Sequence, residues 1–165
     1  VPMRHWLKFG HSMPAISFLG AVIVLWVMID QLPLPEAALD TYVAQRQLME
    51  RIASRVLMPS LLMSLLFGLA SMAAVSGFHG APWAWAKLVT TVLMLEGSLL
   101  GIQSPIKREA VLAEKALVDP VHISELAQNM SSEQMSLVLI GLVATVNVAL
   151  GVWRPKFRAK TTAST

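Results

Sequence analysis

Residues Trp83–Gly101 read WAWAKLVTTVLMLEGSLLG, and this stretch decides the fold. As an α-helix rising about 1.5 Å per residue, it is long enough to cross the roughly 30 Å hydrocarbon core of a bilayer. Lys87 lies near one end of it and Glu96 near the middle. A charge at the centre of a membrane helix costs at least a few kcal/mol, so it usually faces a bundle interior and is often functional. We therefore predict a transmembrane helix with Glu96 inside a bundle.

The composition indicates that lipid surrounds this helix. Of the chain, 55% is hydrophobic and 14% is charged, whereas soluble domains average about a quarter charged residues. The apolar residues form long runs instead of recurring at helical or strand period. Cysteine is absent, which excludes a disulfide framework, a thiolate metal site and a cysteine nucleophile. We expect an integral membrane protein.

Three further apolar runs predict helices at about residues 8–29, 56–75 and 134–153, beside the one at about 84–103. The first run also suits a signal peptide, but it is of membrane length and no small-x-small cleavage site follows it. Four spans place both termini on the same side. The predicted fold is an all-α integral membrane four-helix bundle that forms a single domain over residues 1–165.

Tryptophan supports this topology independently. Four tryptophans fall at helix ends that an even number of spans places on one face, namely Trp6, Trp83, Trp85 and Trp153. Trp26 and Tyr42 mark the opposite face. This distribution is the aromatic belt expected at a membrane interface.

Two long polar connections lie on the side opposite the termini. Residues 36–55 and 106–118 favour amphipathic helices adjoining the transmembrane helices, and Glu109, Glu114 and Lys115 are expected to be exposed.

Two local signals mark helix ends. Pro59 predicts a kink or the first turn of the second helix. Ser131-Ser-Glu-Gln134 has the pattern of a capping box that starts the fourth helix.

Basic residues do not decide the orientation by number, since seven Lys and Arg fall on the terminal side and six on the loop side. The basic tail Arg154–Lys160 favours termini in the cytoplasm. Beside an apolar helix, anionic lipid headgroups are better partners for such a tail than nucleic acid. We expect a bacterial inner (plasma) membrane protein, as a homo-oligomer or within a larger membrane complex.

His11 is the first candidate site residue, at the terminal end of the first helix. Imidazole is a common axial haem ligand and metal ligand, although a polar residue at this depth is also tolerated at the interface. His79 falls in the turn between the second and third helices, on the same side of the membrane. It either approaches His11 across the mouth of the bundle or is a solvated loop histidine.

Lys87 and Glu96 are the two charges within the opening stretch. Lys87 lies just inside Trp85 and is either a snorkelling lysine or a cationic anchor for an anionic ligand group such as a propionate. Glu96 is about 13 Å further along the helix, near the midplane. It is either a proton-relay or ligand-pocket group, or a protonated acid that is hydrogen-bonded to a neighbouring helix.

Other chemistry is weakly marked. Ten methionines suggest copper transport, but they form no tight Met-x-x-Met series, and methionine commonly fills packed apolar space. No phosphate-binding glycine loop, HExxH motif or Ser/His/Asp arrangement is apparent. The sequence therefore assigns no catalytic residue.

Four short motifs are Trp6-Leu-Lys-Phe-Gly-His11, Glu50-Arg-Ile-Ala-Ser-Arg-Val-Leu-Met-Pro59, Phe67-Gly-Leu69 and Trp85-Ala-Lys-Leu88. Together they resemble a superfamily of small membrane proteins that includes the HemJ-type protoporphyrinogen oxidases, the copper-resistance D-like proteins and their four-helix relatives. The resemblance implies a bundle that binds b-type haem, with His11 matching the first-helix histidine and Lys87 the third-helix lysine. The family pattern has a further histidine about two turns after that lysine, where this chain has Glu96. This departure argues against a bis-histidine haem and against the oxidase activity.

Three functions remain open at this stage. The first is a redox or cofactor-binding membrane protein, with haem b between the helices near His11 and Lys87 available to a propionate. The second is a non-enzymatic accessory or structural subunit of a larger membrane complex. The third is a metal or small-solute transport component.

Overall fold

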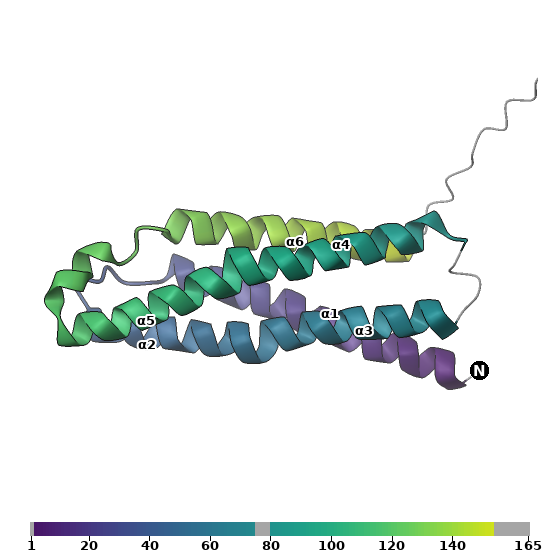
Figure 1. The fold of residues 1–165 in the computed structure, drawn as a ribbon, viewed down its shortest axis with the longest axis horizontal. Helices are drawn as coiled ribbons and strands as arrows, with labels where there is room; N and C mark the ends of the chain where they lie inside the picture. The colour runs from purple at the N-terminus through teal and green to yellow at the C-terminus, as the bar shows by residue number, and fades with distance from the viewer. Residues whose placement is uncertain (1, 75–79, 154–165) are drawn as a thin grey trace, which may run out of the picture.

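The computed structural model describes residues 2–74 and 80–153, and these are helical except for short turns (Figure 1). The helices in chain order are α1 (Pro2–Asp30), α2 (Leu39–Ile52), α3 (Met58–Ala74), α4 (Pro82–Ser98), α5 (Ser104–Val118) and α6 (Met130–Trp153). A 3₁₀ segment, Pro120–Glu125, lies between α5 and α6. The described residues contain no strand, and the all-α prediction is confirmed.

Four helical units are long and apolar enough to cross a membrane. They are His5–Asp30, Leu39–Ala74, Pro82–Val118 and Met130–Trp153. Each predicted transmembrane helix falls on one of these units. The first and last described helices begin and end at the same end of the bundle (Figure 1), so the predicted topology of a four-helix membrane bundle is confirmed.

The two middle units are longer than a bilayer is thick. Leu39–Ala74 has 36 residues and Pro82–Val118 has 37, or about 54 Å each at 1.5 Å per residue. The hydrocarbon core is only about 30 Å thick. The ends of these units furthest from the termini, α2 and α5, therefore extend beyond it. We call residues 31–52 and 104–133 the head of the molecule.

A π-helical turn joins the two parts of each long unit. In the first, Ala53–Leu57, the Met58 N–H donates to the Ala53 carbonyl. In the second, Leu99–Gln103, the Ser104 N–H donates to the Leu99 carbonyl. A proline lies two positions after the last residue of each turn, Pro59 after Leu57 and Pro105 after Gln103.

A proline ring clashes with the carbonyl four residues before it in a regular helix. A wider π turn ahead of the ring provides room, which accounts for the helices continuing without a break. Pro59 lies in the first turn of α3, which was one of its two predicted positions. The continuous helical unit begins earlier, at Leu39.

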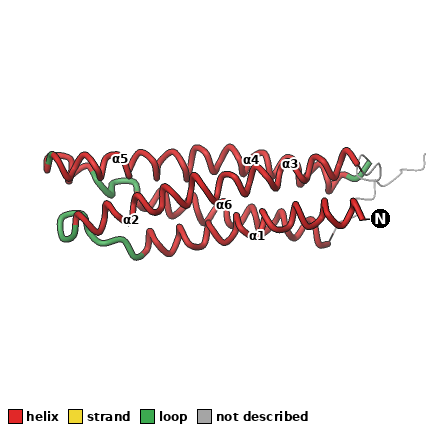
Figure 2. The backbone as a smooth tube through the Cα atoms, turned by 90° about the horizontal axis from the view of Figure 1, so that it is seen from below, coloured by secondary structure: helices red, strands yellow, loops and turns green. Residues whose placement is uncertain are grey.

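The core is formed by pairs of antiparallel helices. In it α1 packs against α3, α4 against α6, and α2 against α5. All helices run along one common axis, with the loops at the ends of the bundle (Figure 2). The most completely buried apolar side chains include Leu25, Ile29, Met49, Leu57, Ile102 and Leu137. A second apolar cluster, built on Tyr42, Val43, Ala113, Ala116 and Leu126, fills the head.

Three predictions about the head are wrong. Tyr42 was expected at the membrane interface and Glu109 in solvent, yet both are buried because α2 and α5 pack against each other. The predicted capping box does not form. Helix α6 begins at Met130, so Ser131 lies inside the helix and is not its N-cap.

Candidate functional site

Polar side chains gather inside the terminal half of the bundle, where α1, α3, α4 and α6 meet. His11 of α1 lies against α3, with Nδ1 2.8 Å from the Ser64 carbonyl oxygen and 3.3 Å from the Ser64 hydroxyl. A carbonyl oxygen can only accept a hydrogen bond. The neutral ring therefore carries its proton on Nδ1, and Nε2 remains a hydrogen-bond acceptor and a base.

Small residues allow α1 and α3 to approach closely at this point. A Cβ atom added at Gly10 would lie 2.6 Å from a ring carbon of Phe67, and one added at Gly68 would lie 3.7 Å from His11 Nδ1. Two of the short motifs, Trp6–His11 and Phe67–Leu69, are therefore in contact. An alanine at position 10 would push the Phe67 ring away and disturb the wall behind His11.

Asn147 of α6 connects this region to α4. Its Nδ2 donates to the Lys87 carbonyl at 3.1 Å and lies 2.5 and 3.1 Å from the hydroxyls of Thr90 and Thr91. Those hydroxyls donate to carbonyl oxygens of their own helix, so they accept from the Asn147 amide. The amide fixes the position of α4, and hence of Lys87, against α6.

The Lys87 side chain extends along α6. A Cβ atom added at Gly151 would lie 2.6 Å from Lys87 Nζ. Because Gly151 has no side chain, the Lys87 ammonium group can occupy the space beside it.

A cavity of about 50 Å³ lies among these groups. Its polar lining consists of His11, Ser64, Lys87, Thr91 and Asn147, and apolar side chains complete it. No Asp or Glu contributes to this lining within the part of the chain that the structure describes. Because the described lining includes a lysine and a histidine and no acidic residue, the cavity favours an anion or a hydrogen-bond acceptor over a cation.

A haem enclosed between the helices does not fit this arrangement. Pockets for drug-sized ligands measure about 300–1,000 Å³, several times the 50 Å³ of this cavity. Residues 2–74 and 80–153 also contain no group of three or more His, Cys, Asp or Glu that could hold a metal ion. A porphyrin beside His11 would require α1, α4 and α6 to separate.

The predicted site residues have three different outcomes. His11 and Lys87 line the same cavity, as their shared side of the membrane suggested. His79 lies outside the described residues. Glu96 is exposed on the outer surface of α4, so the prediction that it faces the bundle interior is wrong.

The rotation of α4 explains the position of Glu96. Successive residues of a helix are turned by about 100°. Gly97 faces α6, because a Cβ there would lie 2.9 Å from Ile140 Cδ1, and Ser98 is fully buried. The polar residue that the fourth span does contribute to the interior is Asn147. As the only side-chain amide within residues 135–153 it was visible in the sequence.

The head contains a second polar cluster, which the sequence did not predict. The Tyr42 hydroxyl donates to Glu109 Oε1 at 2.7 Å, and the Arg46 guanidinium donates to the Tyr42 hydroxyl at 3.1 Å and to the Glu133 carboxylate at 2.6 Å. Glu109 also accepts from the Ala127 N–H at 2.7 Å. These buried groups join α2, α5 and α6. We call Tyr42, Arg46, Glu109 and Glu133 the head network.

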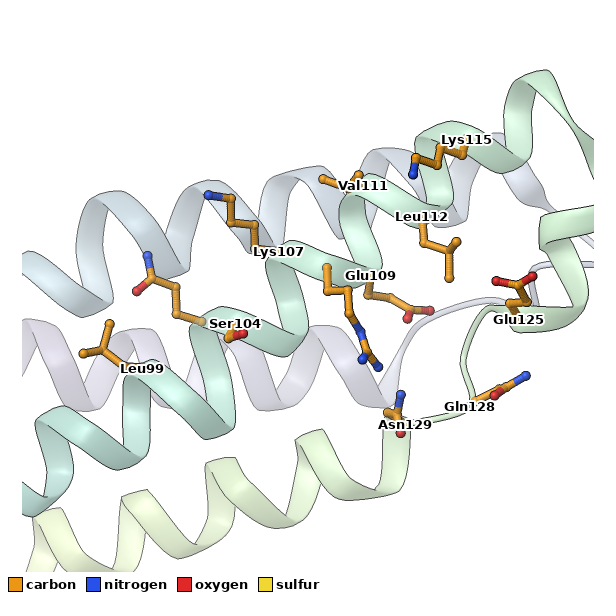
Figure 3. Close-up of a pocket in the computed structure, with 12 residues that line it drawn as sticks. Leu99, Ser104, Lys107, Glu109, Val111, Leu112, Lys115, Glu125, Gln128 and Asn129 are labelled. Atoms are coloured by element: carbon orange, nitrogen blue, oxygen red, sulfur yellow. The ribbon is translucent and has the colours of Figure 1, made fainter.

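An open groove of about 1,060 Å³ runs beside this network, between α5 and the segment that leads into α6. Figure 3 shows the Glu109, Leu112 and Asn129 side chains directed into this space, and Lys107 and Lys115 of α5 also line it. Because its lining contains both carboxylates and basic groups, the groove does not select a ligand by charge. The cavity in the terminal half is the better candidate site.

No protein-family model, curated protein or solved structure matches this chain. The similarity to the HemJ-type superfamily therefore remains an expectation from short motifs.

Proposed function

We propose that this integral membrane protein binds the carboxylate headgroup of a lipophilic small molecule in the cavity between His11 and Lys87. The sequence led us to expect a cofactor-binding protein with haem b near His11. The proposal keeps a bound small molecule at that position but not the haem. The observation that carries it is a lysine and a histidine together in a membrane cavity to whose lining the described residues contribute no carboxylate.

The size of the cavity supports a headgroup rather than a whole ligand. A volume of about 50 Å³ corresponds to one or two water molecules at about 30 Å³ each. Only a small polar group can enter, so the rest of a lipophilic molecule would lie between the outer faces of the helices and the lipid. An apolar tail is at no disadvantage in that position, because lipid is as apolar as the helix surface.

The donors and acceptors of the cavity suit an acid that arrives protonated from the membrane. The O–H of the acid can donate to Nε2 of His11, the ring nitrogen left free when Nδ1 binds the Ser64 carbonyl. Transfer of that proton gives an imidazolium and a carboxylate. Lys87 supplies a second cation next to the carboxylate, so the two charges of the protein stabilise the one formed on the ligand.

The binding of a nitroxide-labelled fatty acid to the protein in liposomes tests this proposal. The fraction of immobilised label, read by electron paramagnetic resonance, should be higher for the acid than for the alcohol of equal chain length. Lys87→Gln should remove most of this preference, by about tenfold, since a charge-assisted hydrogen bond contributes about 1.5–3 kcal/mol. The preference should be weaker in His11→Phe also.

Lys8→Gln is the matched control. Lys8 carries the same charge at the same side of the membrane but is exposed outside the cavity. If Lys8→Gln and Lys87→Gln lower the preference equally, the effect is one of surface charge and the proposal is wrong. A Soret band from protein expressed with ample haem, lost in His11→Ala, would instead favour haem.

The proposal takes the membrane to be a bacterial inner membrane, because helical bundles are typical there and β-barrels are typical of the outer membrane. A reporter fused to the C-terminus would test this placement and the orientation together, since cytoplasmic and periplasmic reporters give opposite readings.

A further inference from the structure

Glu96 occupies the middle of the membrane on the outside of the bundle. Lys87 and Lys107 are twenty positions apart in the sequence, about 30 Å along a helix, which matches the hydrocarbon thickness. Glu96 lies between them, nine residues from the first and eleven from the second. It is the only acidic residue in the predicted spans 8–29, 56–75, 84–103 and 134–153.

The surrounding surface of α4 is apolar. Val92, Leu93 and Leu100 are 46%, 57% and 68% exposed, and they flank Glu96 on the side of the helix that faces away from α6. Within residues 2–74 and 80–153 the Glu96 carboxyl has no hydrogen bond or ion pair. A single copy in a bilayer would therefore present this group directly to lipid, which has no hydrogen bonds to offer.

A neutral carboxyl group is self-complementary. It has one O–H donor and a carbonyl acceptor, so two such groups can close a pair of hydrogen bonds with each other. A two-fold symmetric contact brings the same residue of two copies together. The two Glu96 side chains then lie at the same depth in the membrane. No other chain is needed to satisfy the group.

We infer that two copies of this chain associate in the membrane through the α4 face formed by Val92, Leu93, Glu96 and Leu100, with the two Glu96 carboxyl groups hydrogen-bonded to each other. Polar side chains hold transmembrane helices together in this way. The inference does not depend on the ligand proposed for the His11 cavity, which lies on the inner side of the same helix.

Cysteine cross-linking tests the contact, and the natural absence of cysteine makes single introduced thiols unambiguous. Leu93→Cys and Leu100→Cys should form disulfide-linked dimers on mild oxidation in native membranes. Leu142→Cys is the matched control, since Leu142 is 60% exposed on α6 and faces lipid in the proposed dimer. Equal cross-linking at position 142 would show that the contact is random and would overturn the inference.

The role of the carboxyl group is tested by two substitutions in the otherwise natural chain. Glu96→Leu should weaken dimerisation about tenfold, the effect of losing about 1.4 kcal/mol of interhelical hydrogen bonding. Glu96→Gln should retain it, because an amide also donates and accepts. Single-molecule photobleaching in liposomes at decreasing protein-to-lipid ratio measures the dimer fraction, and co-purification of wild type and variants in mild detergent confirms that each is folded. Dimers of Glu96→Leu as stable as wild type, or no dimers of the wild type, would overturn the inference.

Discussion

The head buries its charged side chains, whereas the His11 and Lys87 side chains of the terminal half are only half-buried. In the head, the guanidinium of Arg46 meets the carboxylate of Glu133 at 2.6 Å, and Glu109 accepts from Tyr42. In the terminal half, His11 and Lys87 share a cavity whose described lining contains no acid.

This difference separates a structural role from a binding role. A buried charge that is paired within the chain holds its helices in register, and within the head network Arg46 Nη2 is the one buried side-chain atom left without a hydrogen-bond partner. A cavity that presents a lysine and a histidine, with no Asp or Glu among its described lining residues, is electrostatically favourable for an anion. The head network therefore stabilises the fold, and the cavity in the terminal half is the place for a ligand.

The largest effect should come from breaking the head network on one side. Glu133→Ala leaves the Arg46 guanidinium buried and unpaired, and removal of one partner of a buried ion pair typically costs about 3–5 kcal/mol. The free energy of unfolding in detergent, followed by tryptophan fluorescence, should fall by that amount. The acid-over-alcohol preference of the cavity should be unchanged in the protein that remains folded.

The double variant Arg46→Met with Glu133→Leu provides the control. Replacing both members of a buried pair with apolar residues of similar size is often neutral or stabilising. If the double variant is as unstable as Glu133→Ala, shape rather than charge pairing holds the head together, and the contrast with the terminal half fails.

The fold could be predicted well from the sequence because lipid imposes strong rules. Apolar runs of bilayer length must be helices, and four of them fix the side on which the termini lie. The segments 36–55 and 106–118 lack the breaks that would separate them from the adjoining spans, and Pro59 interrupts nothing because a π turn precedes it. That compensation depends on backbone geometry, for which the sequence has no clear signal.

The sites were only partly predictable, because a run of apolar residues defines the length of a helix but not its rotation. His11 and Lys87 were correctly placed on one side of the membrane by topology alone. Glu96 was placed on the wrong face of α4, because its small neighbours Gly97 and Ser98 suggested an interior position. Those two residues do face the interior, but Glu96 does not. Pairings across the head, such as Tyr42 with Glu109, depend on packing register, which the amphipathic pattern does not determine.

An intermediate effect is expected in the terminal half from Asn147→Leu. The substitution removes the amide that donates to Lys87 and the Thr90 and Thr91 hydroxyls, and loss of buried hydrogen bonds costs about 1–3 kcal/mol. Thermal unfolding should report a smaller loss than Glu133→Ala gives. Ligand preference should fall as well, because Lys87 loses its fixed position.

Asn147→Gln is the matched variant for that experiment, since it keeps the amide but shifts it by one methylene. Asn147→Gln should be more stable than Asn147→Leu but less stable than the wild type, because the Lys87 carbonyl and the threonine hydroxyls are spaced for the shorter side chain. Unchanged ligand preference in Asn147→Leu would show that Lys87 is positioned by other contacts, and the two regions would then differ less than their charges suggest.

The smallest effect concerns the backbone that closes the head network. Ala127 has a φ of 62°, and its N–H donates to Glu109. A left-handed conformation costs an L-residue about 1–2 kcal/mol, and glycine avoids that cost but loses more backbone freedom on folding, by about 0.5–1 kcal/mol. Ala127→Gly should therefore stabilise the protein by about 0.5 kcal/mol. The same substitution at the exposed helical position Ala44 should destabilise it by about 0.5–1 kcal/mol. If both variants lose stability alike, the Glu109 contact does not hold Ala127 in a strained conformation, and the head network is less rigid than its short hydrogen bonds indicate.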